Sequence, residues 1–126
     1  MPEQLSLRTL NRTLLLRQRL NERVDMPAAD LIRHLVAVQA QEPNWPYVGL
    51  WSRLSDFRPD ELSELLEDRT ILRATTIRRT VHLTDAQDYR WLYPTVRPAL
   101  HAEAERLLPL LAPGEKGKLM IEKVAA

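Results

Sequence analysis

TILRATTIRRTVHLT, residues 70–84, is the part of this chain in which β-branched residues replace leucine-rich patterns. Val, Ile and Thr suit a pleated strand, and apolar positions alternate in places. The segment predicts two strands, Thr70–Thr75 and Arg78–Thr84, that pair as a ribbon, although no Asn-Gly or Asp-Gly pair fixes the turn. Alternation along the second strand would send the side chains of Arg78 and Arg79 to opposite faces.

Four helices are predicted before this ribbon. They cover residues 6–20, Pro27 to Gln39, Tyr47 to Leu54, and Pro59 to Glu67. Ser6 is a suitable N-cap for the first helix. Asp25 with Pro27 gives a cap and first-turn pair for the second.

Apolar residues in these helices recur at helical spacing, which indicates the faces that pack in a core. The faces are Leu7, Leu10 and Leu14 in the first helix, Val48, Trp51 and Leu54 in the third, and Leu62, Leu65 and Leu66 in the fourth. His34 lies between apolar neighbours in the second helix. It is predicted to be a half-buried core residue rather than a catalytic one.

After the ribbon, Thr84 and Gln87 form a capping box, which predicts a fifth helix from Asp85 to Tyr93. A further helical pattern, interrupted at Pro98, continues to Leu111. We find no internal repeat.

Short helices followed by a ribbon that carries arginine outline a winged-helix domain. In that fold a helix-turn-helix approaches duplex DNA and the ribbon touches the backbone beside it. The predicted fold class is α+β, mostly α. A length of 126 residues supports one domain, placed at residues 1–113 because Pro113-Gly114 ends the last helix. Residues 114–126 contain all three lysines and are expected to be a tail, the start of a linker, or sequence foreign to the natural protein.

Composition excludes several classes of protein. Cysteine is absent, so neither a disulfide framework nor a thiolate metal site is possible, and we expect no metal and no cofactor. No apolar run approaches the ~18 residues of a membrane span, and the N-terminus lacks a signal-peptide pattern. A cytoplasmic protein with no membrane partner is therefore the default expectation.

The net charge of +1 says little, but the cations are unevenly placed, and fifteen of the eighteen are Arg. Arg8, Arg12 and Arg19 fall together on the side of the first helix opposite its leucines, at ~100° per residue. Such a stripe suits a helix that offers cations to phosphates. The alternative is an ordinary solvated face.

Gln39 and Gln41 end the apolar run of the second predicted helix, and Pro43 then stops any helix. At a frayed helix end, or in the turn after it, two amides one residue apart can reach the same small ligand, such as a water. The alternative is that they satisfy open carbonyls at the helix C-terminus.

Several motifs in order give the chain a family resemblance. They are Leu10-Asn11-Arg12, Arg17-Gln18, Gln39-Ala40-Gln41, residues 46–54, and Arg78 with Thr80-Val81-His82-Leu83. They resemble the winged-helix DNA-binding proteins related to the AlkZ/YcaQ DNA glycosylases, which remove alkylated bases and unhook interstrand crosslinks. Members of that family are built from tandem winged-helix modules, and the resemblance, over roughly residues 5–100, is to the first module alone.

The resemblance implies that Gln39 and Gln41 match the family's catalytic Gln-x-Gln motif, which is Gln-x-Asp in one branch. It also implies double-stranded DNA as partner, contacted by Arg8, Arg12, Arg19, Arg78, Arg79 and His82, and further modules or a homo-oligomer as neighbours. Arg79 departs from the pattern, because a glycine is usual at that position. A bulky residue there puts close backbone packing, or a positive φ, in doubt.

Cleavage of a glycosidic bond needs a positioned water and stabilisation of positive charge on the sugar. A glutamine carbonyl can aim a water but is hardly basic, so the Gln-x-Gln form suits a leaving group that is already good. An N-alkylated purine that carries a positive charge is such a group. Glu42 could act as a base or be merely solvated, and His82 could contact phosphate or sugar or be structural.

Three functions remain open at this stage. The first is a module of a DNA glycosylase that acts on cationic alkylated purines or crosslinks; the isolated chain would lack activity if its cleft needs other modules. The second is a non-catalytic winged-helix DNA-binding protein, either a regulator or a truncated relative. The third is a winged helix that binds protein, which the near-neutral charge favours.

Overall fold

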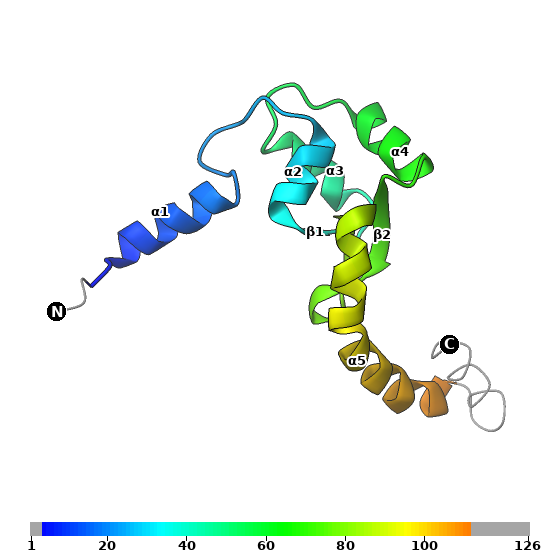
Figure 1. Cartoon of the computed structure of the whole chain (residues 1–126). Coiled ribbons are helices and arrows are strands. Elements are labelled where there is room, and N and C mark those ends of the chain that lie inside the picture. The colour runs from blue at the N-terminus through cyan, green and yellow to red at the C-terminus, as the bar shows by residue number, and fades with distance from the viewer. Residues whose placement is uncertain (1–3, 112–126) are drawn as a thin grey trace.

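A small antiparallel sheet and the helices around it form the fold in the computed structural model, which describes residues 4–111 (Figure 1). In chain order the elements are α1 Leu7–Arg17, α2 Ala28–Leu35, β1 Val38–Gln39, α3 Trp45–Trp51, α4 Pro59–Glu67, β2 Ile71–Thr75, the short 3-10 helix η1 Ile77–Arg79, β3 Val81–Asp85 and α5 Ala86–Leu111. The sheet order is β1-β3-β2. The predicted class, α+β and mostly α, is confirmed.

The β2–β3 ribbon confirms the predicted pairing. Its register runs from Ile71 opposite Asp85 to Thr75 opposite Val81. With α2, β1, α3 and α4 before it, the ribbon gives the chain a winged-helix-like arrangement. The predicted tail at 114–126 and the helix end at Pro113-Gly114 lie outside the described residues.

The core lies between α2, α3, α4 and the sheet. It consists of Ala28, Leu31, Ile32, Val38, Ala40, Leu50, Leu54, Leu62, Ile71 and Leu83. Helices supply half of these side chains, and each strand of the sheet adds one. The sheet is therefore fixed by apolar burial as well as by its hydrogen bonds.

The second helix is shorter than predicted. It ends at Leu35, because Val36 takes a positive φ of 66° and the chain then enters β1. Val38 and Ala40 are buried whereas Gln39 between them is exposed, which is the period of a strand and not of a helix. Pairing with β3, more than forty residues away in the sequence, overrides the local helical pattern.

The third helix starts two residues earlier than predicted and buries another face. Pro46 and Leu50 are buried within it, and Leu54 is buried just after it, at a spacing of four residues. Val48 and Trp51, which were expected to face inward, are 62% and 55% exposed. The correct inward face is the one that meets β1.

The first helix projects away from the rest of the fold, with the N-terminus at its far end (Figure 1). Ser6 caps it as predicted, since the Thr9 amide donates to the Ser6 hydroxyl at 3.1 Å. The helix ends at Arg17 and contains no buried residue. The predicted packing of its leucine face is therefore wrong within the described residues.

The fifth helix runs unbroken through Pro94 and Pro98, contrary to the predicted interruption. Figure 1 shows it bending instead, as expected where prolines remove hydrogen bonds from the inside of a helix. The capping box is also wrong. Asp85 accepts from the Gln87 amide at 2.8 Å, whereas the Thr84 hydroxyl donates to the Val36 carbonyl at 2.9 Å.

Candidate functional site

Gln39 and Gln41 lie at the edge of the sheet and not at a helix end. Gln39 is opposite His82 in the β1–β3 pair and is exposed. The Gln41 side-chain carbonyl accepts from the Val81 amide at 3.2 Å. Gln41 thus extends the pairing of β1 with β3 beyond the Ala40 amide, which donates to the Val81 carbonyl at 2.8 Å. Capping of open helix carbonyls is therefore not the role of Gln41.

A third side chain, Arg73 of β2, holds the segment between the two glutamines. Its guanidinium donates to the Ala40 carbonyl at 3.1 and 3.0 Å and to the Gln41 carbonyl at 3.3 Å. Arg73 could not be identified from the sequence. The backbone that an arginine in a strand will contact across the sheet is not indicated by its neighbours in sequence. The contacts fix the backbone from which both glutamine side chains project.

His82 is held in one orientation beside Gln39. Its Nδ1 lies 2.9 Å from the Thr80 carbonyl and 3.1 Å from the hydroxyl of the buried Thr76. A carbonyl only accepts, so the Nδ1–H donates to it, and the neutral ring then carries its free lone pair on Nε2. In the described part of the chain Nε2 makes no hydrogen bond, which leaves it available to a ligand.

Arg78 and Arg79 lie in the turn between β2 and β3 and not in a strand. Both have positive φ, 55° and 61°, so the expectation that alternation separates their side chains is wrong. Arg79 thus takes a positive φ, the backbone conformation that favours glycine, although its bulky side chain put this in doubt. Arg78 is exposed.

Glu103 of α5 holds Arg79 by an ion pair and also binds Arg106 at 2.7 Å. The hydrogen bond from Arg106 and the charges of both arginines lower the pKa of Glu103. The tip of the ribbon is thereby tied to α5, and part of the positive charge of Arg79 is neutralised.

The arginines of the first helix do not gather at this edge. Arg8 and Arg12 are exposed on α1, which points away from the sheet (Figure 1). Arg19 lies past the helix end, with a φ of 52°, so the predicted three-residue stripe does not form. Glu42 is exposed in the loop after Gln41. The structure brings together Gln39, Gln41 and His82, with Arg78 and Arg79 at the ribbon tip.

His34 is exposed, which corrects its assignment to the core. Its Nε2 lies 3.1 Å from the Arg17 carbonyl, and the Arg53 Nε donates to the Gln18 carbonyl at 2.8 Å. Burial lowers the pKa of Arg53. These two contacts hold the C-terminal end of α1 against the body of the domain.

The helix in the position of a DNA-recognition helix is acidic. α4 carries Asp60, Glu61, Glu64 and Glu67 and no basic residue. Glu61 accepts from the Ala28 amide at 2.7 Å, but Asp60, Glu64 and Glu67 are exposed. Because these carboxylates repel phosphates, insertion of α4 into a DNA groove is electrostatically unfavourable. This signal was present in the sequence, and sequence reasoning missed it.

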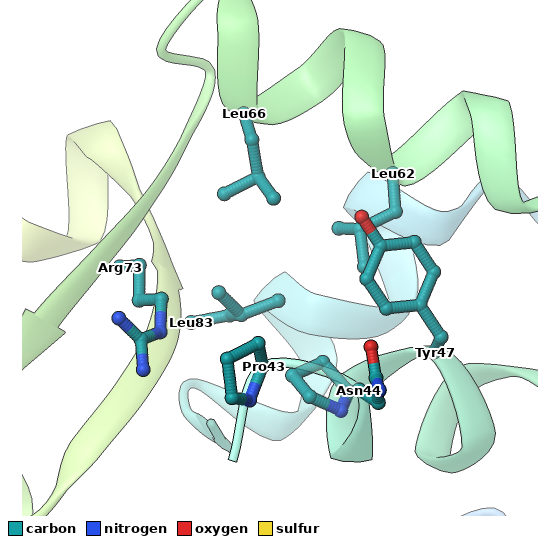
Figure 2. A pocket seen from close by; sticks show the side chains of 8 residues that line it. Pro43, Asn44, Tyr47, Leu62, Leu66, Arg73 and Leu83 are labelled. Carbon is teal, nitrogen blue, oxygen red and sulfur yellow. The ribbon is translucent and has the colours of Figure 1, made fainter. Parts of the chain in front are cut away.

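An apolar cavity of about 260 Å³ lies beside Pro43, two residues after Gln41 in the sequence (Figure 2). Pro43, Leu62, Leu66 and Leu83 line it, and Arg73 closes one side. A guanidinium at its edge would repel a cationic base. The cavity is therefore unsuited to a cationic ligand.

Within the described residues no group of three or more His, Asp or Glu side chains is arranged to hold a metal ion. Over the same part of the chain, no helix has both the length and the apolarity to cross a membrane.

The fold and this edge define a winged-helix-like α+β domain with an amide pair beside a fixed histidine. The chain belongs to the AlkZ-like DNA glycosylase family, since the sequence model described as DNA glycosylase AlkZ-like matches residues 32–125. No curated protein and no solved structure gives a significant match. The function is therefore related to that of DNA glycosylases, with DNA as the partner class. The match includes both glutamines and the whole ribbon.

Proposed function

We propose that this chain is a DNA-binding module of a DNA glycosylase that hydrolyses the N-glycosidic bond of cationic alkylated purines or crosslinks. Gln39 and Gln41 act at the reacting sugar. One observation carries the proposal: Gln39 lies opposite His82 on an exposed sheet edge, and Gln41 is fixed beside them by the Val81 amide.

The two amides have different tasks in this proposal. The Gln39 carbonyl accepts from the attacking water and aims it at the sugar carbon. Gln41 already shares its carbonyl with the Val81 amide, so its position is fixed and its dipole can face the positive charge that develops on the sugar. Nε2 of His82 accepts a hydrogen bond from the attacking water.

No group in this arrangement removes a proton efficiently before the bond breaks. The leaving group must therefore depart with little help, as a purine with a positive charge on its ring does. Such a base leaves as a neutral molecule, and the protein contributes mainly orientation and charge stabilisation. This is why we propose cationic N-alkylpurines as the substrate class.

DNA approaches from the ribbon side in this proposal. Arg78 at the tip of the ribbon is exposed, and Arg79 lies beside it. The acidic α4 faces away from the phosphates, since it would repel them. Binding through Arg78 and Arg79 fixes the duplex without reading its sequence, because phosphate contacts carry no base information.

Single-turnover release of N7-methylguanine tests the proposal. The assayed protein joins this chain to the further modules that the resemblance implies, and it is present in excess over methylated duplex DNA. Replacing Gln39 and Gln41 together by alanine should abolish release and leave DNA affinity nearly unchanged, because interactions made only in the transition state alter rate and not ground-state binding. Gln41→Asp should retain release, since a carboxylate also accepts hydrogen bonds. Gln87→Ala, which removes an exposed glutamine of α5, is the matched control. Release that survives the double substitution would contradict the proposed roles.

A second candidate is a non-catalytic DNA-binding module. The bond from the Val81 amide to the Gln41 carbonyl favours it, because that acceptor is then partly used in holding the sheet edge. The same assay separates the two functions. A protein that joins this chain to the further modules, binds DNA with a clear salt dependence and releases no base would support the second candidate and oppose the first.

A further inference from the structure

Thr76 is a buried polar residue whose hydroxyl contacts the site histidine. It directly follows β2 and is 1% exposed. Its Oγ1 lies 3.1 Å from Nδ1 of His82, and the hydroxyl makes no other hydrogen bond within the described residues. Burial of a hydroxyl is unfavourable unless a partner compensates it. The contact with His82 therefore explains why a hydroxyl is tolerated at this buried position.

The turn between β2 and β3 brings a second oxygen atom to the same nitrogen. The Thr76 amide donates to the Thr80 carbonyl at 3.1 Å, and the Arg79 amide donates to the Thr76 carbonyl at 3.2 Å. Positive φ at Arg78 and Arg79 lets the chain reverse within these bonds. The Thr80 carbonyl, which has two lone pairs, also lies 2.9 Å from Nδ1 of His82. The closed turn thus presents two oxygen atoms to one ring nitrogen.

These two oxygen atoms decide which ring nitrogen of His82 carries the hydrogen. The Thr80 carbonyl can only accept, so Nδ1 carries it. The Thr76 hydroxyl accepts the same hydrogen as the second branch of a three-centre bond. A neutral histidine in water prefers to carry the hydrogen on Nε2, so the turn reverses the intrinsic preference of the ring.

Packing across the sheet does not hold the ring by itself. His82 is half-buried, and its neighbours in the sheet are Ala74 in β2 and Gln39 in β1. Paired residues share one face of a sheet, so these two side chains lie directly beside the ring. An alanine is too short to clamp an imidazole, and the Gln39 side chain is exposed. The orientation of the ring therefore depends on the polar contacts at Nδ1.

We propose that Thr76 is a positioning residue, which holds His82 with its hydrogen on Nδ1 and with Nε2 free to accept. Its part in base release rests on the proposed function, in which Nε2 accepts a hydrogen bond from the attacking water. If the ring turned over, or if the hydrogen moved to Nε2, that water would meet an N–H donor in place of a lone pair. Thr76 is buried and does not itself touch DNA, so it acts on the reaction through His82.

Nitrogen NMR of the isotopically labelled chain measures the state of the ring directly. The spectrum is recorded at about pH 9, above the ordinary pKa of histidine, and a His82→Asn variant identifies this ring among the three histidines. We expect the hydrogen of His82 on Nδ1. Thr76→Val, which keeps the shape but lacks the hydroxyl, should move both ring shifts toward a mixture of tautomers, whereas Thr76→Ser should not. Thr75→Val, at the exposed position directly before, is the matched control.

Two NMR results would overturn the proposal. One is a wild-type His82 that carries its hydrogen on Nε2, which needs no variant. The other is a Thr76→Val variant, folded by circular dichroism, whose ring shifts equal those of the wild type. Both results are independent of base release, so they judge Thr76 separately from the proposed function.

The effect on the reaction is measured in the protein that joins this chain to the further modules. Thr76→Val should slow single-turnover release of N7-methylguanine by up to about tenfold, as the loss of one hydrogen bond predicts, and leave DNA affinity unchanged. Thr76→Ser should keep the wild-type rate. An unchanged rate in Thr76→Val would overturn the part of Thr76 in the reaction. No release by the wild-type protein would instead contradict the proposed function.

Discussion

Removal of the Arg73 guanidinium should loosen the segment that carries both glutamines. Arg73→Ala leaves the Ala40 carbonyl without the donors at 3.1 and 3.0 Å and also removes the longer contact to Gln41. Ala40 is completely buried, so water replaces these donors poorly. One lost charge-assisted bond to a buried acceptor costs about 2 kcal/mol. Total stability is about 5–15 kcal/mol. We therefore expect a fall in Tm of roughly 10 °C.

Urea denaturation measures the global effect, and hydrogen exchange measures the local one. In Arg73→Ala the Val81 amide should exchange faster, because its bond to the Gln41 side chain opens when the segment moves. Arg73→Lys should be intermediate, since one ammonium reaches fewer acceptors. Arg90→Ala, at an exposed position on α5, is the control. Unchanged stability together with unchanged exchange at Val81 would refute the reasoning.

Four further predictions concern α5 and the ribbon tip. Asp85→Ser should have a free energy of unfolding in urea about 1 kcal/mol higher than Asp85→Ala, because serine still accepts a hydrogen bond from the Gln87 amide. Equal free energies would show that this cap does not stabilise α5. Glu103→Gln should tighten DNA binding and steepen its salt slope by roughly 0.9, because Arg79 is freed; a flat response would place Arg79 away from DNA. The pKa of Glu103 is lowered in the fold, so its contribution to stability is present at neutral pH and is lost as pH falls through that lowered value. Thermal melts at a series of pH values measure this loss. The Glu103→Gln variant should not show it, because glutamine does not titrate. Arg79→Gly should be more stable than Arg79→Ala by about 1 kcal/mol, because both lose the charge but only alanine keeps a Cβ at φ 61°; the reverse order would argue against strain.

The ribbon could be predicted from sequence because its signal is local. Residues from Ile71 to Thr75 and from Val81 to Asp85 favour strands by their own composition. The first strand could not be predicted, because Val38–Gln39 is two residues long and gains its pairing from β3. Its local pattern, after a leucine-rich helix, reads as more helix. Long-range pairing decided its conformation.

The same distinction applies to the site residues. Gln39 and Gln41 stood out by their motif, yet their positions in a strand and a loop depend on distant partners. Arg73 gave no signal, since its role exists only once β3 has paired with both β1 and β2 and brought them into one sheet. Periodicity along α1 found the leucine face but wrongly predicted that it packs in the core, since a helical pattern does not show where the helix lies. The positive φ at Arg79 was hidden because the residue there is not glycine.

The spacing of the two glutamines follows from the geometry of the sheet edge. A strand of two residues makes few pairing bonds, so its end needs support from side chains. Gln41 supplies one such support through the Val81 amide, and Arg73 supplies another through the Ala40 carbonyl. Gln39 lies directly before Ala40. Its side-chain amide makes no hydrogen bond within the described part of the chain and is therefore free. A single small residue between them, the buried Ala40, lets both glutamines project from the edge while the backbone stays packed. In the proposed mechanism Gln41 has both a structural and a chemical role, and replacement of Gln39 should affect the reaction with the least effect on the fold.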